Sequence, residues 1–179
     1  ESAKEMLPRL IEIRRDLHRH PELSWKEYRT TRLISEQLQK LGIEVIPWGG
    51  ETGVVGLLHG GEPGPVIGLR ADIDALPIQE QNDCEYRSTV DGVMHACGHD
   101  AHTACLLGAA ELLAARRHEL KGSVKFIFQP SEELADGAKT MMSKKVLENP
   151  QVEAIFGVHN TPNLPAGQVG LTDGPLMAN

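Results

Sequence analysis

The tripeptide Cys97-Gly98-His99 places a thiol and an imidazole two residues apart, with a glycine between them that lets the backbone fold tightly around an ion. A soft sulfur and a borderline nitrogen are ligands that suit Zn²⁺ and similar transition ions. A loop cysteine beside a surface histidine is the more ordinary interpretation of the same residues. The tripeptide therefore predicts a metal site only in combination with other ligands.

Such ligands occur at further places along the chain. Glu132 and Glu133 come soon after an apolar run, where a carboxylate pair could supply one metal ligand and one general base. Asp72 and Asp74 follow another apolar run, and His159 follows a third. Adjacent acids are usually only a solvated surface, and a lone histidine is more often structural than a ligand. Each of these ordinary interpretations would have to hold independently at every place. The recurrence of such polar residues after apolar runs therefore predicts one shared site of metal ligands and proton-transfer groups.

The elements that must position these residues alternate between strands and helices, which indicates an α/β layered domain. Helical spacing of apolar residues predicts helices over about residues 7–17, 25–41, 102–117 and 138–147. Short apolar runs predict strands at 43–47, 54–58, 66–69, 124–128, 154–158 and a candidate sixth at 168–172, with a turn over 60–64. In this assignment, the loop that enters the third helix contains His95, Cys97, His99, Asp100 and His102. The other polar clusters lie at strand ends, where open α/β sheets place their ligand sites.

The composition narrows the class of protein. The 179 residues are 40% hydrophobic and carry a formal net charge of −7, which excludes a disordered tail and argues against a nucleic-acid partner. No apolar run approaches the roughly 18 residues that a membrane span needs. Three cysteines (Cys84, Cys97 and Cys105) and no visible signal peptide predict a reducing, cytoplasmic location. Because the sequence begins at Glu1 and stops without a polar tail, we interpret it as part of a longer protein.

Five motifs follow one another in order along the chain. They are His18-Arg19-His20-Pro21-Glu22-Leu23, Leu69-Arg70-Ala71-Asp72-Ile73-Asp74-Ala75-Leu76-Pro77, Met94-His95-Ala96-Cys97-Gly98-His99-Asp100-Ala101-His102, Gln129-Pro130-Ser131-Glu132-Glu133 and Gly157-Val158-His159-Asn160. Together they resemble the aminoacylase/carboxypeptidase family of two-metal peptidases, in particular its amidohydrolase branch, which includes hippurate hydrolases and plant auxin-conjugate hydrolases.

The resemblance implies a fold. The family has a three-layer α/β catalytic domain, like that of the zinc peptidases, with a mostly parallel central sheet flanked by helices. Residues 1–179 would form the N-terminal segment of this domain. The lid domain, which commonly mediates dimerisation, and the returning C-terminal segment of the catalytic domain would be absent from this chain.

The resemblance also implies the site residues. Those that match the family's metal ligands are Cys97, His99, Glu133 and His159, with Cys97 as the bridging thiolate. Glu132 matches the general base. Asp74 aligns with an aspartate that orients a ligand histidine in other branches of the family. Asp72 stands where those branches carry that histidine, which leaves the roles of both aspartates open.

The remaining polar residues of the motifs are assigned to structure. We expect Asp100 and His102 to brace the loop that carries the ligands. His18 and His20 lie away from the strand ends and are expected to be structural. Cys84 and Cys105 are expected to be ordinary buried or surface residues.

The implied reaction is the metal-dependent hydrolysis of the amide bond of an N-acyl amino acid, with Glu132 taking a proton from water and returning it to the departing amine. The implied cofactors are two divalent ions per full-length subunit, and the ligand set fits Zn²⁺, Mn²⁺, Co²⁺ or Ni²⁺. The implied partners are a small-molecule substrate and further copies of the chain, as a homodimer or homotetramer, with no nucleic acid and no membrane. Residues 1–179 alone are expected to be inactive.

Two alternatives stay open. Cys97, His159 and Asn160 are the residue types of a cysteine hydrolase, although that interpretation leaves Glu132 and Glu133 without a role. The chain could instead be a metal-stabilised binding module without catalytic activity. Sensitivity to a chelator separates the first alternative from the metal enzyme, and metal binding without turnover identifies the second.

Overall fold

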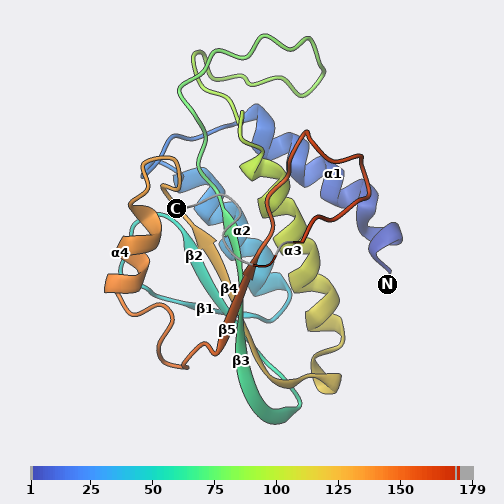
Figure 1. Ribbon diagram of the computed structural model, residues 1–179, viewed down its shortest axis with the longest axis vertical. Helices are drawn as coiled ribbons and strands as arrows, with labels where there is room; N and C mark the ends of the chain where they lie inside the picture. The colour runs from blue at the N-terminus through green and yellow to red at the C-terminus, as the bar shows by residue number, and fades with distance from the viewer. Residues whose placement is uncertain (1, 172, 174–179) are drawn as a thin grey trace.

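The computed structural model describes residues 2–171 and residue 173. Five strands form one sheet in the order β1-β2-β4-β3-β5 (Figure 1). Their bounds are Glu44–Ile46 for β1, Val54–His59 for β2, Glu62–Asp72 for β3, Lys121–Gln129 for β4 and Ala154–Gly157 for β5. β2 is antiparallel to both of its neighbours, while β4, β3 and β5 are parallel to one another. Only β2 therefore runs against the common direction, so the expected mostly parallel sheet is confirmed.

Helices cover both faces of this sheet. They are α1 (Ala3–Arg19), α2 (Tyr28–Lys40), α3 (His99–Ala115) and α4 (Gly137–Ser143), with a short 3-10 helix η1 at Arg117–Glu119. α2 and α3 pack on one face, α1 packs against α3, and α4 lies across the other face (Figure 1). The expected three-layer α/β arrangement is confirmed.

The two cores follow from the alternation of side chains along the strands. Phe126 and Phe128 of β4 point to the larger core under α2 and α3, where Leu38 and Leu107 meet them. Ile127, between the two phenylalanines, points to a smaller core under α4. Because β4 is buried on both faces in its second half, its sequence is a nearly continuous apolar run.

The start of α3 differs from the expectation. The apolar spacing begins at residue 102, but the helix begins at His99, because Gly98 adopts a left-handed conformation (φ 89°) as the N-cap. His99, Asp100 and His102 therefore lie in the first turn of a helix. Only His95 and Cys97 lie in the loop that was expected to hold all five residues.

Other boundaries also move. β3 begins at Glu62, inside the expected turn, because Glu62 pairs with Lys121 of β4. The Pro-Gly-Pro sequence between Glu62 and Val66 lies in an irregular part of the strand, where the register shifts. α4 ends at Ser143 instead of residue 147, and Lys145 has a left-handed backbone (φ 62°). The candidate strand at 168–172 is wrong for residues 168–171, which have no strand conformation, and Thr172 lies outside the described residues.

Two features frame the site. β3, β4 and β5 end at the same edge of the sheet, because Asp72 pairs with Gln129 and Arg70 pairs with Gly157. The long connection from β3 to α3 extends beyond the helices at the top of Figure 1. In the part of the chain that the structure describes, no helix has the length and apolar character needed to cross a membrane.

Candidate metal centre

The edge at which β3, β4 and β5 end brings together the predicted site residues. The segments that follow these strands carry Asp74, the Glu132-Glu133 pair and His159, and α3 begins beside them with His99. His99 belongs to three groups of potential metal ligands, and within each group the ligand atoms lie within 4.8 Å of one another. The groups are Cys97 with His99 and His159, His99 with Glu132 and Glu133, and Asp72 with His99 and His102.

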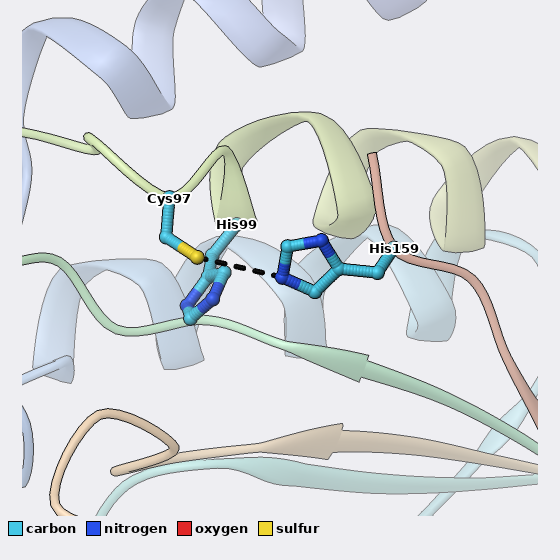
Figure 2. A group of neighbouring side chains, drawn as sticks. All are labelled: Cys97, His99 and His159. Atoms are coloured by element: carbon cyan, nitrogen blue, oxygen red, sulfur yellow. Dashed lines mark hydrogen bonds between the residues drawn. The ribbon is translucent and has the colours of Figure 1, made fainter. Parts of the chain in front are cut away.

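Figure 2 shows the first of these groups. Cys97 lies on the loop that leads into α3, and His99 extends from the start of the helix. His159 reaches toward both from the segment after β5. Gly98 permits this approach, because a Cβ atom there would lie only 2.6 Å from Asn160 Oδ1. The glycine that was expected to allow a tight turn thus also admits the neighbouring segment.

The imidazole of His99 is fixed by Asp74. His99 Nδ1 donates to the backbone carbonyl of Asp74 at 2.9 Å and lies 3.3 Å from Asp74 Oδ1. A carbonyl oxygen only accepts, so the proton is on Nδ1 and Nε2 is free to act as a ligand. His99 Nε2 is buried and has no hydrogen-bond partner among the described residues.

Asp74 also supports the turn that carries the two glutamates. Its Oδ2 atom accepts hydrogen bonds from Ser24 Oγ at 2.7 Å and from the backbone N–H of Glu133 at 3.0 Å. Burial raises the pKa of Asp74, but these hydrogen bonds and the one from His99 outweigh it, so the pKa lies below its usual value. This is the geometry that the predicted orienting role of Asp74 requires, and its part in catalysis stays a prediction.

The two glutamates differ in their surroundings. Glu133 Oε1 lies 3.7 Å from His99 Nε2, and the Glu133 side chain is 20% exposed. Glu132 Oε2 lies 3.8 Å from the same nitrogen, but its side chain is 40% exposed. Burial and the charge of Glu132 raise the pKa of Glu133 despite the nearby imidazole of His99. The more enclosed Glu133 is thus the better candidate for a ligand, and the more open Glu132 for a proton carrier.

Cys97 lies between imidazole and carboxylate groups. Its Sγ atom is 3.4 Å from His159 Nε2, and His159 Nδ1 donates to the backbone carbonyl of Asn160 at 2.6 Å. Burial, followed by the charge of Glu133, raises the pKa of Cys97 to about 12. A thiolate at this position therefore requires a compensating positive charge.

The residues present fit a divalent metal ion. The buried side-chain atoms without a partner in the described part of the chain include His99 Nε2 and Glu133 Oε1, which face each other, and a thiol lies beside them. Buried polar atoms are normally hydrogen-bonded, so such a gap needs a ligand. Imidazole, thiolate and carboxylate together are the donor types that Zn²⁺ and related ions accept.

Asp72 and His102 form a support behind the ligands. Asp72 Oδ2 accepts from Arg70 Nη1 at 2.7 Å, and Oδ1 accepts from His102 Nδ1 at 2.6 Å. Burial raises the pKa of Asp72, but the hydrogen bond from His102 and the charges around it bring the pKa to about 2. His102 Nε2 in turn accepts the backbone N–H of Asn160 at 3.0 Å. Both oxygens of Asp72 are engaged, so the pair connects α3 to the segment that carries His159.

Asp100 and His18 pair with each other and belong to none of the three groups of potential metal ligands found among the described residues. Asp100 Oδ2 accepts from His18 Nδ1 at 2.7 Å and pairs with Arg14 at 2.8 Å, while His18 Nε2 donates to Glu80 Oε1 at 3.0 Å. Burial lowers the pKa of His18, but the hydrogen bonds to Asp100 and Glu80 raise it by more than burial lowers it. The pKa of His18 therefore lies above its usual value. His20 donates to the backbone carbonyl of Asp16 at the end of α1. These contacts join α1, α3 and the long loop.

Sequence reasoning missed the supporting role of several residues around the site. Ser24, Arg70 and Asn160 each contact a site residue or its support, through the hydrogen bonds given above. Ser24 directly follows the His18–Leu23 motif, while Arg70 and Asn160 lie within later motifs, so closeness to a motif or membership of one was the only signal for their supporting role. Cys84 is half-buried and Cys105 is exposed, and both are free thiols.

Comparison with known proteins shows which family the chain resembles. The model of peptidase family M20/M25/M40 matches residues 68–174, more than half of the chain. The matched residues contain four of the five sequence motifs and all of the predicted ligands.

Three similar proteins span most of this chain. N-acetylcysteine deacetylase of Bacillus subtilis is 55% identical over 172 residues, which are 96% of this chain and 45% of the relative. IAA-amino acid hydrolase ILR1-like 2 of Arabidopsis thaliana is 45% identical over 98% of this chain and 39% of the relative. The crystal structure of the Bacillus subtilis YXEP protein, a dinuclear metal-binding peptidase of the M20 family, superposes with a TM-score of 0.93 at 53% identity, covering 98% of this chain and 48% of that chain. The chain thus spans less than half the length of these relatives.

Proposed function

The chain belongs to peptidase family M20/M25/M40, and we propose that it forms the metal-binding part of a metal-dependent amidohydrolase that cleaves the amide bond of N-acyl amino acids. The observation that carries the proposal is the buried Nε2 atom of His99, which has no hydrogen-bond partner among residues 2–171 and 173 and lies among the thiol of Cys97, His159 and two carboxylates. Asp74 holds the imidazole with this nitrogen aimed at the cluster.

The substrate class is supported by the relatives. One is named for deacetylating N-acetylcysteine and another for hydrolysing IAA-amino acid, and both substrates are amino acids in conjugated form. Both relatives match this chain over nearly its whole length. We infer an amino acid conjugate as the substrate here, with the acyl group left to experiment.

Four residues would hold the ions. They are Cys97, His99, Glu133 and His159, and their mixed sulfur, nitrogen and oxygen donors suit Zn²⁺, Mn²⁺, Co²⁺ or Ni²⁺. When bound, two such ions act as Lewis acids that polarise a carbonyl group and lower the pKa of water. The similar YXEP protein is a dinuclear metal-binding peptidase, which supports two ions over one.

Glu132 would carry the proton. Its carboxylate is partly open to solvent and lies 3.8 Å from His99 Nε2, so it can reach a water molecule beside the cluster. Glu132 Oε2 accepts a proton as that water attacks the amide carbon, and returns it to the nitrogen of the departing amine. Asp74 contributes indirectly, because it orients His99 and holds the backbone N–H of Glu133.

The assembly and location of the whole protein are further proposals. Four protein ligands are few for two ions, so we propose that a chain of the relatives' length completes the centre, and that residues 1–179 alone bind at most one ion tightly and turn over no substrate. We also propose a homodimer or homotetramer in the cytoplasm, acting on small molecules without a nucleic-acid or membrane partner.

A cysteine hydrolase is the second candidate, and one contact favours it. Cys97 Sγ lies 3.4 Å from His159 Nε2, as in a nucleophile and its base. The surroundings oppose it, because burial and acidic neighbours raise the pKa of Cys97 to about 12, whereas a nucleophilic thiol needs a lowered pKa. Asn160, which would complete the triad, places its side-chain Oδ1 atom against Gly98 and His102 Nε2 instead.

The test is metal removal and restoration. The full-length protein, of the relatives' length, is treated with a chelator, assayed against a panel of N-acyl amino acids, and then reconstituted with each of the four ions in turn. We expect activity to disappear with the metal and to return with at least one ion. Activity that resists the chelator and disappears on thiol alkylation would identify the cysteine hydrolase. Tight metal binding without turnover of any amide would favour the binding module.

A further inference from the structure

The link between α1 and α2 lies directly against the metal centre, although nothing in the proposed reaction uses it. Within this link, Ser24 donates to Asp74 Oδ2 at 2.7 Å. Trp25 donates from its indole N–H to Asp136 at 3.2 Å and has a left-handed backbone (φ 61°). The link thus contacts both the residue that orients His99 and the far end of the turn that carries the glutamates.

Glu27 makes the most direct contact of this link. Its side chain is completely buried, and its Oε1 atom accepts the backbone N–H of Ser131 at 2.9 Å. This is the one side-chain hydrogen bond of normal geometry that Glu27 makes within the described residues, and its Oε2 atom is enclosed without such a partner. Burial raises the pKa of Glu27, an effect that the Ser131 N–H opposes.

Ser131 begins the turn that places Glu132 and Glu133. Its backbone is left-handed (φ 50°), an uncommon conformation for serine that its surroundings must maintain. Its hydroxyl donates to Asp136 Oδ1 at 2.6 Å, and its carbonyl accepts the N–H of Gly137 at 3.1 Å. Glu27 holds the third polar group of this residue. The direction in which the chain leaves Ser131 sets where both glutamates lie.

An acid at position 27 is costly for stability alone. A buried carboxylate is poorly solvated, and an apolar side chain of similar volume would avoid that penalty. What a carboxylate provides here, and an apolar side chain does not, is an acceptor for a backbone N–H at a strained position. The desolvation penalty at position 27 is not explained by local stability, which indicates that the carboxylate has a role in the site.

We propose that Glu27 is a positioning residue of the metal centre: by holding the N–H of Ser131, it fixes the turn that presents Glu132 as proton carrier and Glu133 as ligand. This inference rests on the proposed function for the roles of the two glutamates. The contact between Glu27 and the turn does not depend on the proposed function.

The experiment compares Glu27→Met, Glu27→Gln and Glu22→Met in the full-length protein, of the relatives' length. Methionine is similar in length but accepts no strong hydrogen bond, whereas the glutamine oxygen can still accept from Ser131. Glu22 is a matched control, because it is an acid of the same link whose carboxylate accepts the backbone N–H groups of Arg29 and Thr30 at the start of α2. It makes no hydrogen bond to the turn in the described part of the chain.

Three quantities are measured. In Glu27→Met, hydrogen exchange of the Ser131 amide should accelerate about tenfold, as expected for the loss of one buried hydrogen bond. Zn²⁺ affinity, measured by competition with a chromophoric chelator, should fall about tenfold, the lower end of what supporting contacts contribute to metal sites. Turnover of an N-acyl amino acid should fall at least about tenfold with little change in KM, because the base is misplaced and substrate binding is not. Glu27→Gln should restore most of each loss.

The control and the contrary outcomes use the same measurements together with the melting temperature. Glu22→Met should lower the melting temperature while leaving Ser131 exchange and Zn²⁺ affinity at wild-type values. Unchanged exchange and affinity in folded Glu27→Met would overturn the proposal, and so would equal losses in Glu22→Met. If Glu27→Met does not fold, Ser131 exchange in the wild type still tests the proposal. A Ser131 amide that exchanges as fast as an unprotected loop amide would overturn the proposal. A wild type without amidase activity would instead contradict the proposed function, since exchange and Zn²⁺ affinity need no substrate.

Discussion

Two buried histidines near the first turn of α3 show how similar side chains acquire different uses. His18 has a carboxylate on each ring nitrogen, Asp100 on one side and Glu80 on the other. His99 has a carbonyl on Nδ1 and no partner on Nε2 among the described residues. Both rings are almost inaccessible to solvent. The difference teaches that burial and acidic neighbours alone do not identify a ligand, and that the decisive feature is a ring nitrogen left unpartnered among other unpartnered donors.

The largest expected effect lies on the His99 side of this comparison. Glu132→Gln should reduce turnover by about 10² to 10⁴, the range of a general base, because an amide cannot take up the proton. Metal content should stay at the wild-type value, as measured by elemental analysis alongside steady-state kinetics. A variant nearly as active as its parent would show that another residue moves the proton.

Glu133→Gln should separate the neighbouring glutamate from Glu132. Replacing a ligand carboxylate with an amide should weaken metal binding by roughly 10-fold to 100-fold, so that part of the lost activity returns when metal is added in excess. Titration of activity against metal concentration measures this directly. Equal losses in the two variants, insensitive to added metal, would contradict the division between ligand and base.

On the His18 side, substitution should affect stability and leave the metal alone. His18→Asn should lower the free energy of unfolding by about 2 kcal/mol, because Asp100 and Glu80 each lose a buried partner. His20→Asn is the control, since it removes one partly exposed hydrogen bond at the end of α1 and should cost less than about 1 kcal/mol. Chemical denaturation gives both values, and a large loss of metal affinity in His18→Asn would show that the two histidines are not separate.

The reactivity of Cys97 sharpens the choice between metal ligand and nucleophile. In metal-free protein, burial and nearby carboxylates raise the pKa of this thiol to about 12. Alkylation should therefore be slow at neutral pH and rise about tenfold per pH unit, since only the thiolate reacts. Site-resolved mass spectrometry measures the rate between about pH 6 and pH 9, well below that pKa. Rapid labelling of Cys97 at neutral pH would support the cysteine hydrolase alternative.

The smallest expected effect is the pH dependence that His18 contributes. Its pKa is raised in the folded protein, so the folded state holds this proton more tightly than the unfolded state does. The stabilisation is fully present below the ordinary histidine pKa of about 6.5 and disappears as the pH rises through the folded value. The stability difference between wild type and His18→Asn should therefore shrink from about pH 6 to about pH 9, and a growing difference would mean that the folded ring is neutral.

The strand ends of the site could be predicted because they obey a local rule. Apolar runs that precede Asp72, Glu132 and His159 indicate buried parallel strands, and parallel strands bring the residues after their carboxyl ends to one edge of the sheet. The start of α3 could not be placed in the same way, because apolar spacing does not report the left-handed N-cap at Gly98. The division between His18 and His99 could be anticipated only from their positions, since His99 lies among the strand-end motifs and His18 does not.

The supports of the site lay beyond sequence reasoning for a different reason. Glu27 and Ser131 are 104 residues apart, and Ser24 and Asp74 are 50 residues apart. No periodicity connects residues at such separations, and each pair is formed only when the link between α1 and α2 packs against the ends of β3 and β4. The failed strand at 168–171 shows the opposite error, since apolar residues alternating with glycine resembled a strand without a neighbour to pair with.

The order of the strands also has a consequence for synthesis on the ribosome. Cys97 and His159 meet across a separation of 62 residues, and His159 follows β5, the last strand of the sheet among the described residues. A nascent chain that has emerged only as far as β4 can pair β2, β3 and β4 and bury most of the larger core, yet it lacks the imidazole that closes the cluster around Cys97. Non-local contacts of this kind form late. We therefore expect the proposed metal cluster to assemble only after β5 and the segment that follows it have emerged.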